Sequence, residues 1–172
     1  MNGYTCSCCG EYHETLPLAY GADAPAYWYA MEPAERDQRF QLSEETAVLD
    51  GAHFFVRGRL EIPVHDSPEA FGWGVWVTMS QDSFRRMLEL WDAPDRADRL
   101  EPSAGWLSTH LGIYPETINL RARLHHRPPG LRPLIELEPT DHPLAVEQRT
   151  GITLARVEEI AAAMHKASGS GA

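Results

Sequence analysis

Two long runs of alternating apolar and polar residues constrain the fold of this chain more than any other feature. The apolar positions are Phe54, Val56, Leu60, Ile62 and Val64 in the first run, and Phe71, Trp73, Val75, Val77 and Met79 in the second. A period of two is typical of a β-strand with one buried face. The first run follows Asp50-Gly51, a dipeptide that favours a two-residue hairpin turn after a short strand at 47–49. We therefore expect antiparallel strands at 53–64 and 71–79.

Three other segments have the period of an amphipathic helix. Pro33 suits the first turn of a short helix that ends near Phe40. Ser80 is suited to cap a second helix, in which apolar residues recur at i, i+3, i+4 and i+7. Those apolar residues are Phe84, Met87, Leu88 and Trp91. A third helix is expected at 154–164, and such stripes predict helices that cover a sheet.

The remaining segments complete the fold prediction. Alternation predicts strands at 118–124 and 133–137, joined by a Pro-Pro-Gly turn. The Pro-containing segments 16–30 and 92–102 are expected to be an ordered loop and a solvent-exposed connection. Strands joined by short turns, with helices between and after them, favour an α+β fold. We expect a mainly antiparallel sheet covered by one or two amphipathic helices.

Length and composition fit one domain. With 172 residues, of which 43% are hydrophobic, the chain can bury a core without disulfides or metal. We expect a single α+β domain at 1–167, which begins with a Cys-rich knuckle at 1–15. A flexible Gly/Ser tail is expected at 168–172.

The net charge of −10 at pH 7 decides which partners are expected. This charge repels a phosphate backbone, and the chain has one lysine, Lys166, and no basic stripe, so we expect no nucleic acid. The sequence also shows no secretory signal pattern and no apolar run of about 18 residues, so we expect no membrane and a cytoplasmic location. A basic protein is the expected kind of partner, because opposite charges attract over long range.

The densest chemistry lies near the N-terminus. All three cysteines, Cys6, Cys8 and Cys9, occur within four positions, followed by Gly10 and His13. The spacing of Cys6 and Cys9 lets both sulfurs face one tetrahedral zinc ion, and His13 can supply a third ligand. Gly10 permits the tight positive-φ turn that such a knuckle needs. A complete zinc site needs a fourth ligand, and the sequence offers no second cysteine pair to provide it.

Two other interpretations of this cluster stay open. A thioredoxin-like redox pair normally lies at a helix N-terminus after a strand, and no strand is predicted before Cys6. A metal-free loop that carries thiols is the plainest interpretation. In each case an odd number of cysteines fits a reducing compartment better than a disulfide framework.

A second candidate site lies at the end of the strand predicted at 133–137. Glu136 and Glu138 share one side, and Asp141 and His142 follow in a Pro-rich turn. Oxygen and imidazole ligands at one strand end suit a divalent metal or a general base, so these four residues are candidate catalytic residues. The plainer alternative is a solvated strand face, with Asp141 in an Asx turn.

Arg57 and Arg59 are candidate ligand-binding residues. They share the polar face of one strand, where a surface ion-pair ladder with the carboxylates that follow Ile135 would explain them. If the arginines were instead buried in a cleft with His53 or His125, they would form an anionic-ligand site.

Trp76 is a third candidate ligand-binding residue. Gly72 and Gly74 lie on the same face of its strand, which indicates that something packs close to the backbone there. Together these residues could offer a flat contact surface to a partner or a small ligand. Packing in the core or at a sheet edge is the alternative.

Several ordered segments resemble one known family. They are the pattern Cys6-x-x-Cys9-Gly10-x-x-His13 and the segments 53–64, 71–77, 105–107 and 135–148. Together they resemble the bacterial domain-of-unknown-function family 2199 over nearly the whole chain. The resemblance implies no activity. It also implies a further cysteine within 46–48, a segment that here contains none, so a fourth ligand would be missing.

Two hypotheses for function follow. The first is a non-catalytic binding or interaction module with a structural zinc knuckle. The second is a small metal-dependent enzyme that uses the acidic and histidine residues at the strand end. The chain has no Gly-rich phosphate loop, no nucleophile elbow and no His-Glu-x-x-His pattern, so the first hypothesis is favoured.

Overall fold

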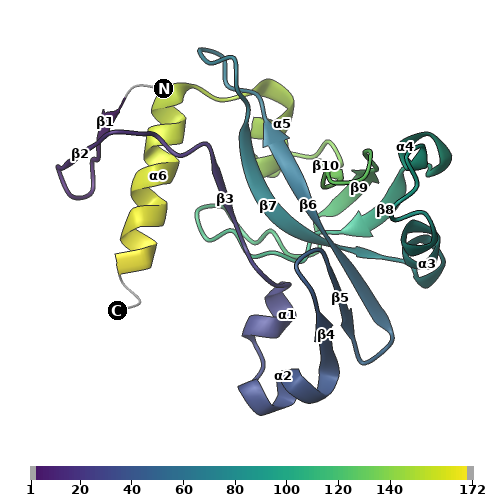
Figure 1. Cartoon of the computed structure of the whole chain (residues 1–172). Coiled ribbons are helices and arrows are strands. Elements are labelled where there is room, and N and C mark those ends of the chain that lie inside the picture. Colours follow the sequence, from purple (N-terminus) through teal and green to yellow (C-terminus); the bar gives the residue numbers. More distant parts are fainter. Residues whose placement is uncertain (1–2, 170–172) are drawn as a thin grey trace.

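The computed structural model of the chain describes residues 3–169. Within this range the chain has the expected α+β fold, with one mixed sheet of eight strands and a separate hairpin of β1 and β2 (Figure 1). The strands are β1 (Tyr4–Thr5), β2 (Tyr12–His13), β3 (Ala19–Gly21), β4 (Phe40–Leu42), β5 (Thr46–Leu49), β6 (His53–Ile62), β7 (Phe71–Met79), β8 (Ser103–Trp106), β9 (Arg121–His125) and β10 (Leu134–Leu137). The helices are α1 (Ala26–Tyr29), α2 (Pro33–Arg39), α3 (Gln81–Glu89), α4 (Arg96–Arg99), α5 (Pro143–Thr150) and α6 (Leu154–Gly169).

The sheet is built around β6 and β7, the two strands that the alternation predicts. They pair antiparallel, from Phe54 opposite Met79 to Ile62 opposite Phe71. The main strand order is β3-β7-β6-β10-β9-β8, and β5 pairs with both β4 and β6. Two pairs, β3 with β7 and β6 with β10, are parallel, and the other pairs of the sheet are antiparallel. The mainly antiparallel sheet is therefore confirmed, and its two parallel pairs make it mixed.

Local signals at two positions are confirmed. Asp50 and Gly51 have the positive φ values, 54° and 63°, of the predicted type I′ turn, but Leu49 pairs with His53, so three residues and not two connect β5 to β6. The Ser80 hydroxyl accepts a hydrogen bond from the Ser83 N–H at 3.1 Å and so caps α3. Leu88 was expected in the buried stripe of this helix but is 46% exposed, because α3 buries a narrower stripe than predicted.

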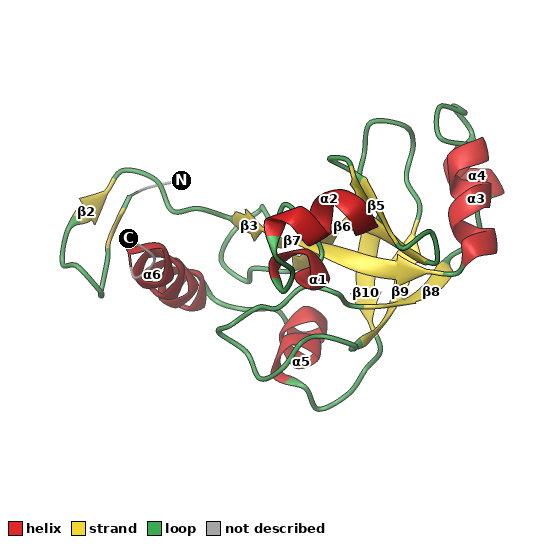
Figure 2. Cartoon of the chain, turned by 90° about the horizontal axis from the view of Figure 1, so that it is seen from below, coloured by secondary structure: helices red, strands yellow, loops and turns green. Residues whose placement is uncertain are grey.

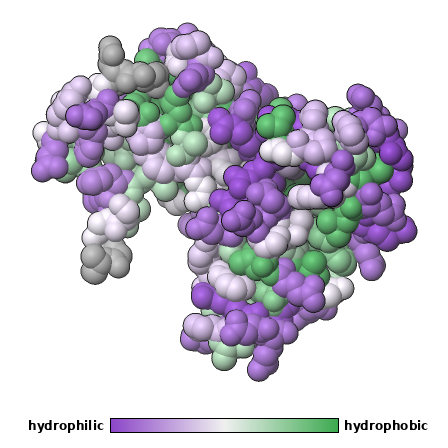
Figure 3. All heavy atoms as spheres, viewed as in Figure 1, coloured by the Kyte–Doolittle hydropathy of each residue, from purple (hydrophilic) through white to green (hydrophobic). Residues whose placement is uncertain are grey.

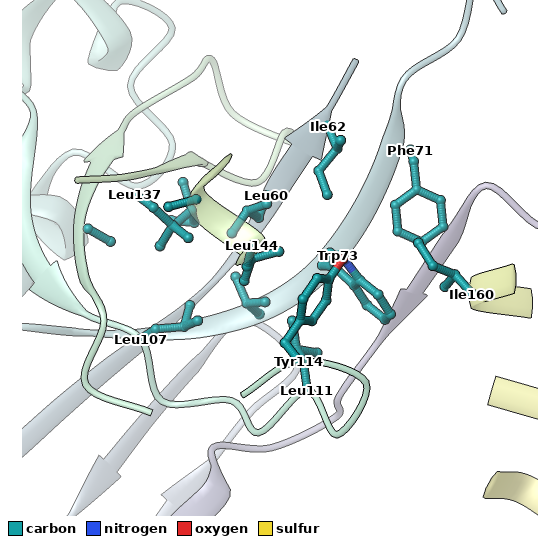
Figure 4. Close-up of a cluster of buried hydrophobic side chains, with 14 of the residues drawn as sticks. Leu60, Ile62, Phe71, Trp73, Leu107, Leu111, Tyr114, Leu137, Leu144 and Ile160 are labelled. Atoms are coloured by element: carbon teal, nitrogen blue, oxygen red, sulfur yellow. The ribbon is translucent and has the colours of Figure 1, made fainter. Parts of the chain in front are cut away.

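Two hydrophobic cores lie on opposite faces of β6 and β7. In the larger core, α5, α6 and the loop at 107–114 pack on one face (Figure 4). Its fully buried side chains include Leu60, Trp73, Leu107, Leu144 and Ile160. The smaller core lies on the other face, beside α1 and α2, and contains Phe40, Ala47, Leu49, Phe55 and Trp76.

Trp76 does not form the exposed contact surface that was one of its two interpretations. Trp76 is fully buried, and its Nε1–H donates a hydrogen bond to the Ala22 carbonyl at 3.0 Å. The alternation correctly places Trp76 and Trp73 on opposite faces of β7. Both faces are covered at this part of the sheet, so the packing alternative is the one confirmed.

Several segments gain structure that local patterns do not predict. The expected loop at 16–30 contains β3 and α1, and the expected exposed connection at 92–102 contains α4, whose Arg96 is buried. The sequence patterns assign no element to the segments that form β8 and α5, and the expectation of no strand before Cys6 is wrong, because β1 directly precedes it. The final helix continues to Gly169, two residues into the expected tail, and residues 170–172 lie outside the described residues.

The surface seen in Figure 3 is predominantly hydrophilic, and apolar side chains appear there in separate patches. Between residues 3 and 169, no helix combines the length and apolar character that a membrane crossing requires.

Candidate metal centre

The N-terminal hairpin positions the cysteine cluster. β1 and β2 pair antiparallel, with Tyr4 opposite His13. Between the strands, the Cys6 N–H donates to the Glu11 carbonyl at 2.9 Å, and the Gly10 N–H donates to the Cys6 carbonyl at 2.8 Å. Gly10 has a φ of 74°, so the predicted positive-φ turn is confirmed. The turn brings the cysteines back to His13.

The three ligands predicted from the sequence meet at this hairpin. The ligand atoms of Cys6, Cys9 and His13 lie within 4.8 Å of one another, and Cys9 Sγ is 3.7 Å from His13 Nε2. Zinc binds thiolate and imidazole at about 2.0–2.3 Å, which places the ligand atoms of a tetrahedron roughly 3.3–3.8 Å apart. Small side-chain movements would therefore bring all three onto one ion.

Cys8 and His165 add two further ligand atoms. With Cys9 they form a second group whose ligand atoms lie within 4.8 Å of one another. His165 belongs to α6, which lies beside the hairpin in both Figure 1 and Figure 2. Its ring meets the ring of His13 edge to face, with centroids 5.7 Å apart. Cys9 is therefore shared by two groups of three candidate ligands, which together offer five side chains for a tetrahedral ion that needs four.

Contacts inside the cluster favour a metal-binding form of Cys6. The hydrogen bond between Cys6 Sγ and Cys8 Sγ, 2.9 Å apart, lowers the pKa of the Cys6 thiol and raises the pKa of the Cys8 thiol to about 11. A thiolate is the form that binds metal. Tyr4 stacks on His13 at 5.2 Å between ring centroids and holds the imidazole against the hairpin.

His165 is a candidate fourth ligand that the sequence did not suggest. His165 lies at the far end of the described chain, where no spacing rule relates it to the cysteines. A cysteine in the segment 46–48 would not have served, because β5 lies at the other end of the molecule from the hairpin (Figure 1). Ala47 in that strand is fully buried in the smaller core.

Comparison with known proteins supports the resemblance. The model of a bacterial family, described as an uncharacterized protein conserved in bacteria (DUF2199), matches residues 5–152. The chain belongs to this family. The match includes Cys6, Cys9 and His13 and ends before α6. No curated protein and no solved structure matches the chain.

In this DUF2199 protein the four candidate catalytic residues do not converge. Glu136, Glu138 and Asp141 are exposed. His142 Nδ1 accepts a hydrogen bond from the Leu144 N–H at 3.2 Å, so this histidine caps α5. Within residues 3–169, no group of side chains that could hold a metal ion includes any of the four. A catalytic role for these residues stays a prediction.

Arg57 and Arg59 have partners other than the predicted ones. Arg57 Nη2 lies 3.2 Å from Asp23, and Arg59 Nε lies 2.9 Å from Glu61. The predicted ladder with the carboxylates after Ile135 is wrong, because β10 pairs with β6 at a single register position that precedes them. Both arginines instead line a cavity, as in the alternative of a cleft, but the histidine that lines it with them is His126 and not His53 or His125.

Proposed function

We propose that this protein is a non-catalytic binding domain in which a structural zinc ion attaches the N-terminal hairpin to α6. The meeting of thiol and imidazole side chains from the two ends of the described chain carries this proposal. Thiolates and imidazoles in tetrahedral sets are typical ligands of zinc. Cys6, Cys9, His13 and His165 are the proposed ligands.

The ligand count supports a structural ion. A catalytic zinc keeps one position open for water or substrate, whereas here Cys8 or His165, which both lie near Cys9, would supply a fourth ligand beside Cys6, Cys9 and His13. The hairpin consists of two strands of two residues each, so zinc binding would add free energy to the folding of a very short sheet. The redox alternative finds less support, because the turn after Cys6 leads into β2 and not into a helix.

Elemental mass spectrometry of untagged protein, purified without a chelator, tests the proposal. We expect stoichiometric zinc in the unaltered protein and its loss in Cys9→Ser, because Cys9 belongs to both ligand groups. His165→Asn should weaken zinc binding by more than about tenfold, since even loss of an outer-shell partner weakens metal sites by that much. The matched control is His110→Asn, which alters an exposed histidine outside the site and should leave the zinc in place.

Unaltered protein that contains no zinc, and takes up none on titration, would contradict the proposal. Zinc that survives in His165→Asn but is lost in Cys8→Ser would assign the fourth position to Cys8. In that case the ion would fix the hairpin alone and would not reach α6.

The proposals of a basic protein partner and of a cytoplasmic location are supported by the sequence alone. The net charge of −10 supports a basic protein partner, and a reducing cytoplasmic compartment would keep the thiols available for metal. The enzyme alternative gains no support from the geometry, because its four residues lie apart from any metal-ligating group in the described part of the chain.

A further inference from the structure

A cavity of about 650 Å³ lies between the polar face of β6 and β7 and the loop that joins β9 to β10. Gly58, Gly72 and Gly74 form part of its lining, together with residues of β3 and α4. None of the five candidate metal ligands lines it. Sites for small molecules typically measure about 300–1,000 Å³, so the cavity is large enough for a small organic ligand.

The lining of this cavity is positive, although the protein is acidic. Five arginines and two carboxylates line it, which gives a net charge of +3, against −10 for the whole chain. The arginines are Arg57, Arg59, Arg96, Arg127 and Arg132, and the carboxylates are Glu45 and Asp92. Charges of one sign in a cleft focus their field, because the surrounding protein has a low dielectric constant. The lining therefore favours an anion.

Arg57 is a largely buried cation with incomplete partners. Its side chain is 15% exposed, and among the described residues its Nε–H has no hydrogen-bond acceptor. The carboxylate of Asp23 lies 3.2 Å away, but that side chain is 93% exposed, so water screens the pair. A buried donor without an acceptor is unfavourable, so protein groups satisfy this guanidinium only in part.

Arg59 depends on a glycine for its position. A Cβ atom on Gly72 would lie 2.6 Å from Arg59 Cζ, so the guanidinium lies directly against the backbone of β7. This close approach explains why a glycine occupies position 72. The pair of Arg59 with Glu61 involves side chains that are 36% and 40% exposed, so it is weak and open to competition. A guanidinium presents parallel N–H donors that match phosphate and carboxylate oxygens.

Two further arginines are fixed by protein partners. Arg132 forms a bidentate pair with Glu45, in which Nε donates to Oε2 and Nη2 donates to Oε1, each at 2.9 Å. Arg96 is buried, and backbone carbonyls orient it without neutralising its charge. The carbonyls that accept its hydrogen bonds are those of Trp91, Arg127, Pro128 and Leu131. The positive field is therefore present before any ligand arrives.

His126 lines the same cavity in its neutral form. Burial, followed by the positive charges of Arg96 and His125, lowers the pKa of His126 to about 4. At neutral pH this imidazole adds no charge, and it can donate or accept one hydrogen bond. It is a polar contact for a ligand beside the arginines.

We propose that this cavity binds a small organic anion and that Arg57 and Arg59 hold its phosphate or carboxylate group. The two arginines lie on the same face of β6 at alternate positions, about 7 Å apart along the strand, so one anionic group can contact both. Tyr20, Trp91 and Leu131 also line the cavity and offer apolar surface to the body of the ligand. This site is independent of the proposed zinc ion.

Calorimetric titration of the full chain with inorganic pyrophosphate and, separately, with citrate tests the proposal and distinguishes phosphate from carboxylate. We expect saturable binding of at least one probe and a Kd raised at least about tenfold in Arg59→Gln. The matched control is Arg85→Gln, which removes the same charge from an α3 side chain that is 68% exposed. Its Kd should stay within about twofold of the unaltered protein.

Failure of both probes to saturate the protein would overturn the proposal, as would an equal loss of affinity in Arg85→Gln. Circular dichroism checks that each variant folds, and Arg57→Gln replaces Arg59→Gln if the latter does not. Cys9→Ser, which removes the proposed zinc, should keep the affinity for the anion. The zinc and anion proposals can therefore fail separately.

Discussion

Replacing Tyr114 by Phe should lower the free energy of unfolding by about 3 kcal/mol, because it removes the central oxygen of a buried network. The Tyr114 hydroxyl donates to Glu147 Oε2 at 2.6 Å and accepts from Trp73 Nε1–H at 3.3 Å. Arg156 pairs with Glu147 at 2.8 Å. The network thus joins β7, α5, α6 and the loop that carries Tyr114, whose ring lies beside that of Trp73 in Figure 4.

The magnitude follows from each partner in turn. A hydrogen bond to a carboxylate contributes about 1.5–3 kcal/mol. Trp73 is 1% exposed, so its N–H would lose its acceptor inside the core, which adds about 1 kcal/mol because the existing bond is long. Glu147 keeps Arg156 as its partner, so no unpaired buried charge arises. Burial and the nearby Glu147 raise the pKa of Tyr114, so the hydroxyl remains a donor across the working pH range.

Urea denaturation measures this loss as a lower midpoint with an unchanged slope. In a thermal scan the same loss corresponds to a decrease of about 6–12 °C for a domain of this size. Tyr27→Phe is the control, because it removes the same hydroxyl from a side chain that is 39% exposed. This change should alter the free energy of unfolding by less than about 0.5 kcal/mol. If Tyr114→Phe lowered stability by less than about 1 kcal/mol, the hydroxyl would not have the stabilising role assigned to it.

Three further predictions concern the metal, pH and two glycines. A chelator should speed amide hydrogen exchange in the hairpin and α6 but not in β6 and β7, and equal exchange with and without chelator would argue against a bound ion. The free energy of unfolding should fall as pH decreases from about 6.5 to about 4, because the unfolded state protonates His126 while the folded state keeps it neutral. Urea denaturation at several pH values should show a smaller fall in His126→Gln. Gly72→Ala should weaken binding of the anionic probes with little effect on the urea midpoint, since the methyl group displaces only the flexible end of Arg59. Gly58→Ala should instead lower stability by about 2 kcal/mol, because its methyl group would meet the Ile135 side chain at 2.6 Å; an unchanged midpoint would show that the core can yield there.

The fold elements that the sequence predicts are those whose signals are local. Alternation along β6 and β7, the Asp50-Gly51 turn and the Ser80 cap each depend on residues only a few positions apart. β3 has no such signal, because it is three residues long and forms by pairing in parallel with β7. Arg96 lies in a charged segment that suggests exposure, yet carbonyls from a distant loop make its burial favourable.

The same distinction holds for the candidate sites. Spacing alone identified Cys6, Cys9 and His13, because one turn of the hairpin brings them together. His165 requires the packing of α6 against that hairpin, which no local pattern contains. Alternation placed Trp76 on the correct face of β7, but it cannot show that a second layer covers that face.

The packing of the hairpin beside α6 also sets an order of events during synthesis. The hairpin is translated before the sheet, but the helix that lies beside it is made only after the whole sheet. Until then Tyr4 and Cys6, both buried in the finished core, lack part of their cover. Contacts between residues so far apart in sequence form slowly, because a long stretch of chain must first be ordered. The hairpin, although translated before the sheet, is therefore expected to be among the last of the described elements to reach its final position, and the nascent chain would expose it to chaperones throughout that interval.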